Sequence, residues 1–207
     1  MRFLLFPAFA VALMGQSTSP AALNLGDSMP TFSLPKLDGN TLNANWIQGP
    51  VLVVFLSTQC PTVLATEDRI NALAKTFAGT VAVLGINSND SGRTGKKEEG
   101  MEGMKARAKE KKYPFIYMKD ASQVVARAFG AAVTPDFFLF NQGKLVYHGR
   151  LDDNAFKTED VTRHELFEAI EALESGHAPK PDQSPALGCP ITWKPQQQHQ
   201  PAKVKPK

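Results

Sequence analysis

The stretch that decides the fold of this chain reads VLVVFLSTQCPT over residues 51–62. Its first six residues form an unbroken apolar and β-branched run after Gly49-Pro50, which is typical of a central strand covered on both faces. Pro61 stands where a helix can begin, because the N–H that proline lacks would be unpaired there. The stretch therefore predicts a buried strand that runs into a helix, with Cys60 at the junction.

Alternating strands and helices are predicted on both sides of this junction. The helix from Pro61 has apolar residues at helical spacing, namely Val63, Ile70, Leu73, Ala74 and Phe77, and carries Glu67, Asp68 and Arg69 on its polar side. Other strands are predicted at 80–86, 113–118, 137–140 and 144–147, and other helices at 121–129 and 162–175, the last capped by Thr162.

This order of elements defines the predicted fold class. Residues 31–43 are expected to form a small N-terminal β-hairpin, with turn residues at Asp38-Gly39-Asn40. Strands that alternate with helices imply right-handed parallel crossovers, and the last two strands form an antiparallel hairpin around Asn141-Gln142-Gly143. The sequence therefore predicts an α/β fold of three layers around a mixed central sheet.

Composition excludes several classes of protein. The 207 residues are 43% hydrophobic and carry a formal net charge of +3, which argues against a dedicated nucleic-acid binder. No apolar run approaches the ~18–20 residues that a membrane-spanning helix needs. Two cysteines are too few for a disulfide scaffold or a four-thiolate zinc site. The histidines His148, His164, His177 and His199 lack metal-ligand spacing, so we predict neither a metal nor a cofactor.

Both ends of the chain differ from its centre. Residues 1–22 combine a positive start, an uncharged apolar stretch and small residues, which is the pattern of a secretory signal peptide; a buried N-terminal helix or an uncleaved anchor is the alternative. We expect export to the periplasm or the extracellular space, with no stable membrane insertion after cleavage. Residues 23–177 are expected to form the domain, and residues 178–207 an extended, proline-rich tail.

Residues 93–112 are rich in lysine and arginine. A basic patch for anionic partners is one interpretation. A solvated amphipathic helix, with Met101, Met104 and Ala108 on its apolar stripe, is the favoured one.

Cys60 is the candidate reactive residue. Ligands of open α/β sheets bind beyond the carboxyl ends of parallel strands, where Cys60 lies. A thiol at a helix N-terminus faces unpaired N–H groups and the positive end of the helix dipole, which favour the thiolate and lower its pKa. The alternative is a buried structural cysteine, because free cysteine is often buried.

The sequence resembles the thioredoxin-like redoxins, and in particular the alkyl hydroperoxide reductase C / thiol-specific antioxidant (peroxiredoxin-like) group. Peroxiredoxins carry a Thr/Ser-x-x-Cys-Pro-Thr pattern, which Ser57, Cys60, Pro61 and Thr62 match. Similarity to bacterial exported thioredoxin-family proteins extends over about residues 26–195 through these further motifs: Glu67-Asp68-Arg69, 86–90, 134–140, 144–147 and 188–194.

The resemblance implies a thioredoxin-like fold and roles for five residues. Cys60 would be the attacking thiolate, Ser57 and Thr62 nearby hydroxyls, and Pro135 a cis proline that helps hold an extended substrate. Cys189, in a Gly-Cys-Pro-Ile-Thr-Trp-Lys segment, resembles a C-terminal resolving cysteine, with a static disulfide or a buried anchor as the alternatives.

The same resemblance implies partners. They are a peroxide or disulfide substrate and a thiol electron-donor protein, and a homodimer is left open. Two departures from the family pattern stand out: Ser57 replaces the first cysteine of the relatives' Cys-x-x-Cys, and Val53 replaces a proline. No arginine can be assigned to the thiolate from the sequence. Three functions therefore compete: a peroxiredoxin-like thiol oxidoreductase, a thiol–disulfide exchange protein and a redox-inactive binding module.

Overall fold

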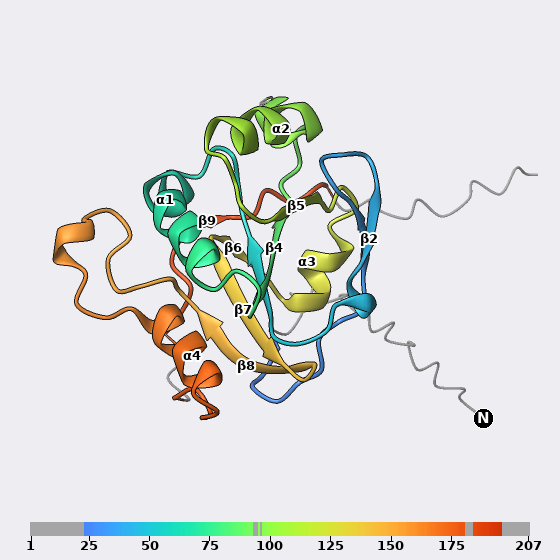
Figure 1. Cartoon of the computed structure of the whole chain (residues 1–207). Coiled ribbons are helices and arrows are strands. Elements are labelled where there is room, and N and C mark those ends of the chain that lie inside the picture. Colours follow the sequence, from blue (N-terminus) through green and yellow to red (C-terminus); the bar gives the residue numbers. More distant parts are fainter. Residues whose placement is uncertain (1–22, 93–94, 96, 181–183, 196–207) are drawn as a thin grey trace, which may run out of the picture.

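The computed structural model describes residues 23–92, 95, 97–180 and 184–195 (Figure 1). Its centre is a mixed sheet with the strand order β5-β4-β3-β7-β8. The predicted buried strand is β3 (Val51–Phe55), which pairs in parallel with β4 (Ala82–Asn87) and antiparallel with β7 (Asp136–Asn141). Because β3 lies in the middle, all five of its residues are buried.

The outer strands follow the predicted order. β5 (Ile116–Lys119) pairs in parallel with β4, and β8 (Lys144–Gly149) pairs antiparallel with β7. The small N-terminal hairpin is β1 (Ser33–Pro35) and β2 (Thr41–Asn43), which confirms that prediction. Helices α1 (Pro61–Thr76), α2 (Met101–Glu110), α3 (Val124–Phe129) and α4 (Glu165–Glu174) occupy the predicted crossovers and the end of the domain.

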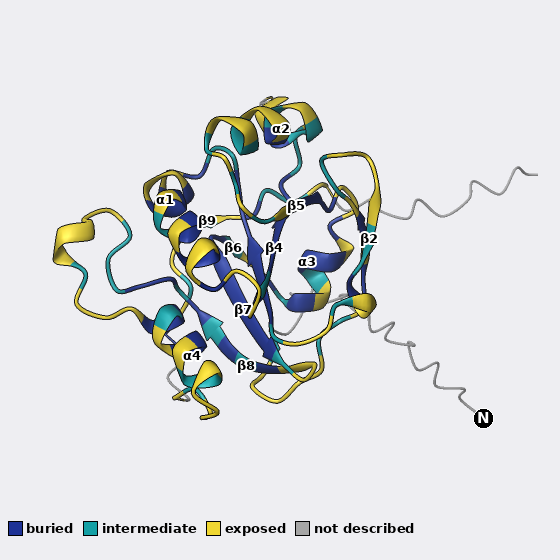
Figure 2. Cartoon of the chain, in the orientation of Figure 1, coloured by how far each residue is buried: buried dark blue, intermediate teal, exposed yellow. Residues whose placement is uncertain are grey.

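Side chains of alternating parity fill two cores, one on each face of the sheet. Leu52, Val54 and Leu56 pack under α1, α2 and α4, whereas Val51, Val53 and Phe55 pack under α3 and the β1–β2 hairpin. Figure 2 shows the buried sheet between exposed helix surfaces. This sandwich is the predicted three-layer α/β arrangement, and every predicted apolar position of α1 is buried.

Two predictions about polar side chains are wrong. Glu67 does not face solvent: its side chain is 2% exposed and pairs with Arg107 and Lys111. A buried carboxylate needs such partners because desolvation of an unpaired charge is costly. Thr162 does not cap the last helix, because its N–H and hydroxyl both bind the Asp153 carboxylate and the helix begins only at Glu165.

The C-terminal segment adds a second, small sheet. β9 (Cys189–Pro190) pairs antiparallel with β6 (Val133–Thr134), far from it in the sequence (Figure 1). Ile191, next to β9, is buried in the core on the α3 face. The described tail residues 184–195 therefore lie against the domain. The proposed signal segment, 1–22, lies outside the described residues and stays a prediction. Among the described residues, no helix has the length and apolar character needed to cross a membrane.

Candidate functional site

Cys60 lies where β3 gives way to α1. It occupies the position before the first helical residue, and Pro61 is the first residue of the helix, as the sequence indicates. Leu56 still donates its N–H to Ile86 of β4, so the loop 57–60 begins at the end of the parallel pair. The Cys60 residue is only 3% exposed. Strand and helix together thus fix a thiol at the carboxyl edge of the sheet.

Cys189 is the residue that the structure brings to Cys60. The two sulfur atoms lie 2.6 Å apart although the residues are 129 positions apart in the chain, and both cysteines are free. A disulfide bond is about 2.05 Å long. The two sulfurs therefore need only a small movement to form one when an oxidant removes two electrons and two protons. The sequence leaves open whether the tail reaches Cys60; in the structure it does.

Thr134 and Pro135 lie beside the thiol pair. The Thr134–Pro135 peptide bond is cis, as predicted. The Cys60 thiol donates a hydrogen bond of 3.0 Å to the Thr134 carbonyl oxygen, and Thr134 is also the strand partner of Cys189. One residue therefore contacts both halves of the thiol pair through its backbone.

Gly188 permits the approach of the tail to Thr134. A Cβ at position 188 would lie 2.0 Å from the Thr134 carbonyl oxygen, which is far inside van der Waals contact. Backbone atoms of a paired strand cannot yield as a flexible side chain can. Cys189 thus reaches Cys60 because the residue before it has no side chain.

Ser57 acts on the backbone of the loop rather than on the sulfur. Its hydroxyl accepts hydrogen bonds from the N–H groups of Gln59 and Cys60, and it donates to Glu99 at 2.5 Å. Glu99 is 3% exposed and accepts further hydrogen bonds from the Thr58 N–H and the Asn87 amide. We therefore describe Ser57 as a residue that shapes the cysteine loop.

Glu99 was missed by sequence reasoning. It lies in the basic stretch whose predicted character is a solvated amphipathic helix, and for this residue that prediction is wrong. The neighbouring Lys119 is also buried and donates to the Glu99 and Asn89 carbonyl oxygens and to Asn87. Burial lowers the Lys119 pKa to about 8 although nearby carboxylates oppose the shift. No spacing in the sequence links these residues to Ser57.

The two thiols differ in their electrostatic surroundings. Burial alone would raise the pKa of the Cys60 thiol, but hydrogen bonds from the Cys189 thiol and the Val63 N–H hold this pKa below its usual value. Burial, followed by the contact with Cys60, raises the pKa of Cys189, while the backbone and hydroxyl of Thr62 oppose that shift. Cys60 is thus the better thiolate of the pair, in the direction predicted, and Thr62 faces Cys189.

The tail is held by polar groups of two loops and of helix α3. Thr192 donates its N–H to the Asn89 side chain and accepts from the Asp90 N–H and the Gln123 amide. The Arg127 guanidinium lies 4.4 Å from the centre of the Trp193 ring, which is a cation–π contact. The segment Ile86–Asp90 is one of the motifs that carry the family resemblance. The resemblance does not, however, predict that Asn89 or Gln123 binds the tail.

A small cavity of about 20 Å³ is lined by residues that include Thr62, Pro135, Leu187 and Arg150. Neither cysteine is among its lining residues, although Thr62 and Pro135 belong to the segments that surround the thiol pair. The cavity has room for about one water-sized molecule. The Arg150 guanidinium binds the Glu165 carboxylate, and no contact of Arg150 with either sulfur is seen among the described residues.

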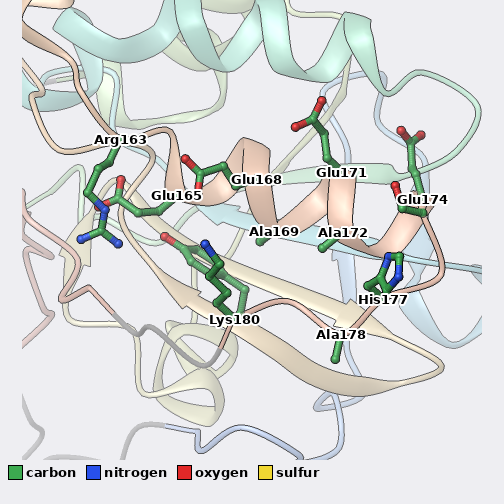
Figure 3. A pocket seen from close by; sticks show the side chains of 12 residues that line it. Arg163, Glu165, Glu168, Ala169, Glu171, Ala172, Glu174, His177, Ala178 and Lys180 are labelled. Carbon is green, nitrogen blue, oxygen red and sulfur yellow. The ribbon is translucent and has the colours of Figure 1, made fainter.

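A larger cavity of about 820 Å³ lies elsewhere, along α4 (Figure 3). Its wall carries Glu168, Glu171, Glu174, His177 and Lys180 and no cysteine. His148 pairs with Asp136, and His199 falls outside the described residues. Within the part of the chain that the structure describes, no group of three or more His, Cys, Asp or Glu side chains could hold a metal ion.

Comparison with known proteins gives the following matches. The sequence profile described as the AhpC/TSA family matches residues 25–148. A hypothetical protein from Sinorhizobium meliloti is similar in structure, with a TM-score of 0.78 and 38% identity over 84% of this chain and 97% of that one. For an uncharacterized conserved protein from Geobacillus kaustophilus, the TM-score is 0.78 and the identity 35%, over 84% and 94% of the chains.

More distant structures agree in fold alone. The thioredoxin domain of a thiol-disulfide oxidoreductase from Bacteroides vulgatus has a TM-score of 0.50 and 21% identity, over 61% of this chain and 89% of that one. None of the curated proteins matches the chain in sequence. The fold is thus thioredoxin-like, as the resemblance predicts, with its two thiols at the carboxyl edge of the sheet.

Proposed function

Because the chain belongs to the AhpC/TSA family, we propose that it is a thiol oxidoreductase in which Cys60 reacts with a small oxidant and Cys189 closes a disulfide with it. The observation that carries the proposal is the 2.6 Å separation of the two free sulfurs. A redox-inactive binding module has no need to bring its two cysteines together from positions 129 residues apart.

The first step is an attack of the Cys60 thiolate on a peroxide. Sulfur donates an electron pair to one peroxide oxygen, the O–O bond breaks, and the second oxygen leaves as hydroxide, which takes a proton to become water. The product is a sulfenic acid on Cys60. Support for this step comes from the pKa of Cys60, which its hydrogen bonds hold below the usual thiol value.

The second step joins the two cysteines. The Cys189 thiolate attacks the Cys60 sulfur, the S–O bond breaks, and hydroxide leaves and is protonated to water. Each turnover thus reduces one peroxide: hydrogen peroxide gives two molecules of water, and an alkyl peroxide gives one molecule of water and one of alcohol. In the same turnover two thiols are oxidised to one disulfide. A dithiol of an electron-donor protein then supplies two electrons and two protons to restore both thiols.

A specific contact favours a small oxidant over a protein disulfide. The tail strand already pairs with Thr134, beside the cis Pro135, so an extended peptide substrate cannot lie on the same backbone groups. The cavity lined by Thr62 and Pro135 measures only about 20 Å³ and has no room for a peptide. Thiol–disulfide exchange with a protein substrate would therefore require the tail to leave first.

We also propose that the protein works outside the cytoplasm. The support is the pattern of residues 1–22, which has the charge, apolar stretch and small residues of a signal peptide. A reversible disulfide suits such a compartment, where structural disulfides also persist. Since both cysteines of the pair belong to one chain, the proposed chemistry needs no second copy.

Rapid mixing tests the proposal. Reduced protein is mixed with one equivalent of hydrogen peroxide or, separately, with oxidised glutathione, and free thiols are counted over time. We expect both thiols to disappear far faster with peroxide than with the disulfide. Cys60→Ser is the matched control that should abolish the fast phase. Equal rates of thiol loss in Cys60→Ser and the unchanged protein would contradict the proposal.

A further inference from the structure

Gln123 precedes α3 and has an unusual backbone. Its φ of 62° is in the left-handed region, which non-glycine residues seldom adopt. The preceding turn is held by Asp120, whose carboxylate accepts hydrogen bonds from the Ser88 hydroxyl and the Ala126 N–H. Gln123 itself is 1% exposed. The turn thus aims a long polar side chain into the protein, where it needs partners.

All the hydrogen bonds of this side chain go to two segments. Its amide nitrogen donates to the Ser88 carbonyl oxygen at 2.6 Å and to the Thr192 carbonyl oxygen at 2.8 Å. Its oxygen accepts from the Lys194 N–H at 2.8 Å. One amide therefore binds the backbone of the tail on both sides of Trp193 and ties it to the loop after β4.

These contacts lie close in sequence to Cys189. The pairing of β9 covers residues 189 and 190, and Ile191 donates its N–H to the Ala132 carbonyl oxygen. The hydrogen bonds of Gln123 to residues 192 and 194 extend this attachment beyond the strand and help to fix its direction. A misplacement of about 1 Å in reacting atoms can cost on the order of 10²-fold in rate. The side chain that binds Thr192 and Lys194 thus contributes to the position of the Cys189 sulfur.

We propose that Gln123 is a positioning residue for bridge formation: its amide holds the tail so that the Cys189 sulfur meets the Cys60 sulfur. The inference rests on the proposed function and adds to it a residue that touches neither sulfur. The proposed role concerns the second chemical step alone. Among the described residues, Gln123 makes no hydrogen bond to the Cys60 loop, so oxidation of Cys60 does not require the Gln123 amide.

Three variants test this role. Gln123→Met keeps the length of the side chain and removes its hydrogen bonds. Lys194→Pro acts from the tail side: it removes the N–H that donates to the Gln123 oxygen, and it substitutes no buried side chain. Gln142→Met is the matched control, because Gln142 also has a positive φ, of 50°, but is exposed in a distant hairpin turn.

Each full-length variant is mixed with hydrogen peroxide, and two rates are followed. Formation of the sulfenic acid is trapped with dimedone, and the disulfide is measured by mass spectrometry under non-reducing conditions. For Gln123→Met and Lys194→Pro we expect sulfenic acid to form at least as fast as in Cys189→Ala, which lacks the hydrogen bond from Cys189 to Cys60, and the bridge to form at least tenfold more slowly than in the unchanged protein. Gln142→Met should leave both rates unchanged.

The outcomes are distinguishable. Bridge formation at the unchanged rate in Lys194→Pro and in a folded Gln123→Met would overturn the positioning role and leave the proposed function intact. If Gln123→Met does not fold, Lys194→Pro alone decides. Failure of the unchanged protein to form either a sulfenic acid or the Cys60–Cys189 bridge would instead contradict the proposed function.

Discussion

Cys60 and Cys189 lie side by side, yet different forces hold them. Cys60 belongs to the strand–helix junction at the centre of the domain, where β3 is buried on both faces. Cys189 belongs to a two-residue strand that pairs with Val133 and Thr134 and continues into a short segment. Hydrogen bonds with Asn89 and Gln123 and the buried side chain of Ile191 hold this segment. The domain core thus fixes one thiol, whereas hydrogen bonds and a small apolar contact fix the other. The tail thiol should therefore be separable from the domain without unfolding it.

The largest expected effect separates these two regions by stability. Phe55→Ala should lower the free energy of unfolding by about 3–5 kcal/mol, because Phe55 is fully buried, packs edge-on against the Phe129 and Phe138 rings, and its deletion leaves a cavity. Urea denaturation measures this loss. The same truncation at Ile191 removes a buried side chain of the tail, but the loss is limited to the free energy with which the tail docks.

Trp193 reports that docking. In a Trp46→Phe background, Trp193 is the remaining tryptophan, so its fluorescence reports whether the tail is docked. In the Ile191→Ala variant, this fluorescence should change at a urea concentration well below the one that unfolds the domain. A single transition that covers both the tail and the domain would contradict the separation of the two regions.

Gly188→Ala should move the tail without touching the Cys60 loop. The new Cβ would meet the Thr134 carbonyl oxygen at 2.0 Å, so β9 must shift away from β6. We expect bridge formation to slow by on the order of 10²-fold, because reacting atoms are misplaced by about 1 Å. Because the bridge forms more slowly, the sulfenic acid on Cys60 should persist, and its labelling by dimedone should increase. Gly143→Ala is the control for a loss of stability without displacement of β9, because its new methyl group meets nothing within 4 Å while the φ of 73° is strained for alanine.

Glu99→Gln perturbs the other side of the comparison. The substitution removes the charge behind the hydrogen bonds from Ser57, Thr58 and Asn87. Hydrogen bonds to charged groups contribute about 1.5–3 kcal/mol each, so a loss of about 2 kcal/mol in stability is expected, together with slower oxidation of Cys60. Chemical denaturation and peroxide kinetics measure the two effects. Unchanged values for both would show that the buried carboxylate does not support the loop.

The smallest expected effect is on pH dependence. The rate at which iodoacetamide alkylates Cys60 follows the fraction of thiolate. Because hydrogen bonds lower the pKa of Cys60, the midpoint of this rate against pH should lie below the free thiol value of ~8.5. Cys189→Ser keeps a hydroxyl that can donate to the thiolate, so the midpoint should stay low. Cys189→Ala removes the donor, and the midpoint should rise. Equal midpoints in the two variants would exclude the Cys189 hydrogen bond as a cause.

The sequence predicts the first thiol region much better than the second. An apolar run followed by Cys-Pro specifies a strand, a helix and the residue between them through local patterning, and β3, α1 and the hairpin of β7 and β8 follow from it. The contacts of Glu99, Gln123 and Asn89 depend on which loops meet at one edge of the sheet. No periodicity encodes such long-range polar pairs, so Glu99 is wrongly predicted as solvated and Gln123 is not predicted at all.

The most direct test of the account is a peptide map of the oxidised protein under non-reducing conditions. Equal amounts of unlabelled and ¹⁵N-labelled reduced protein are mixed and treated with one equivalent of hydrogen peroxide per chain. The account predicts a Cys60–Cys189 bridge in which both peptides carry the same label, because the two sulfurs meet within one chain. A free Cys189 beside an oxidised Cys60, or bridges that join labelled to unlabelled peptides, would contradict it.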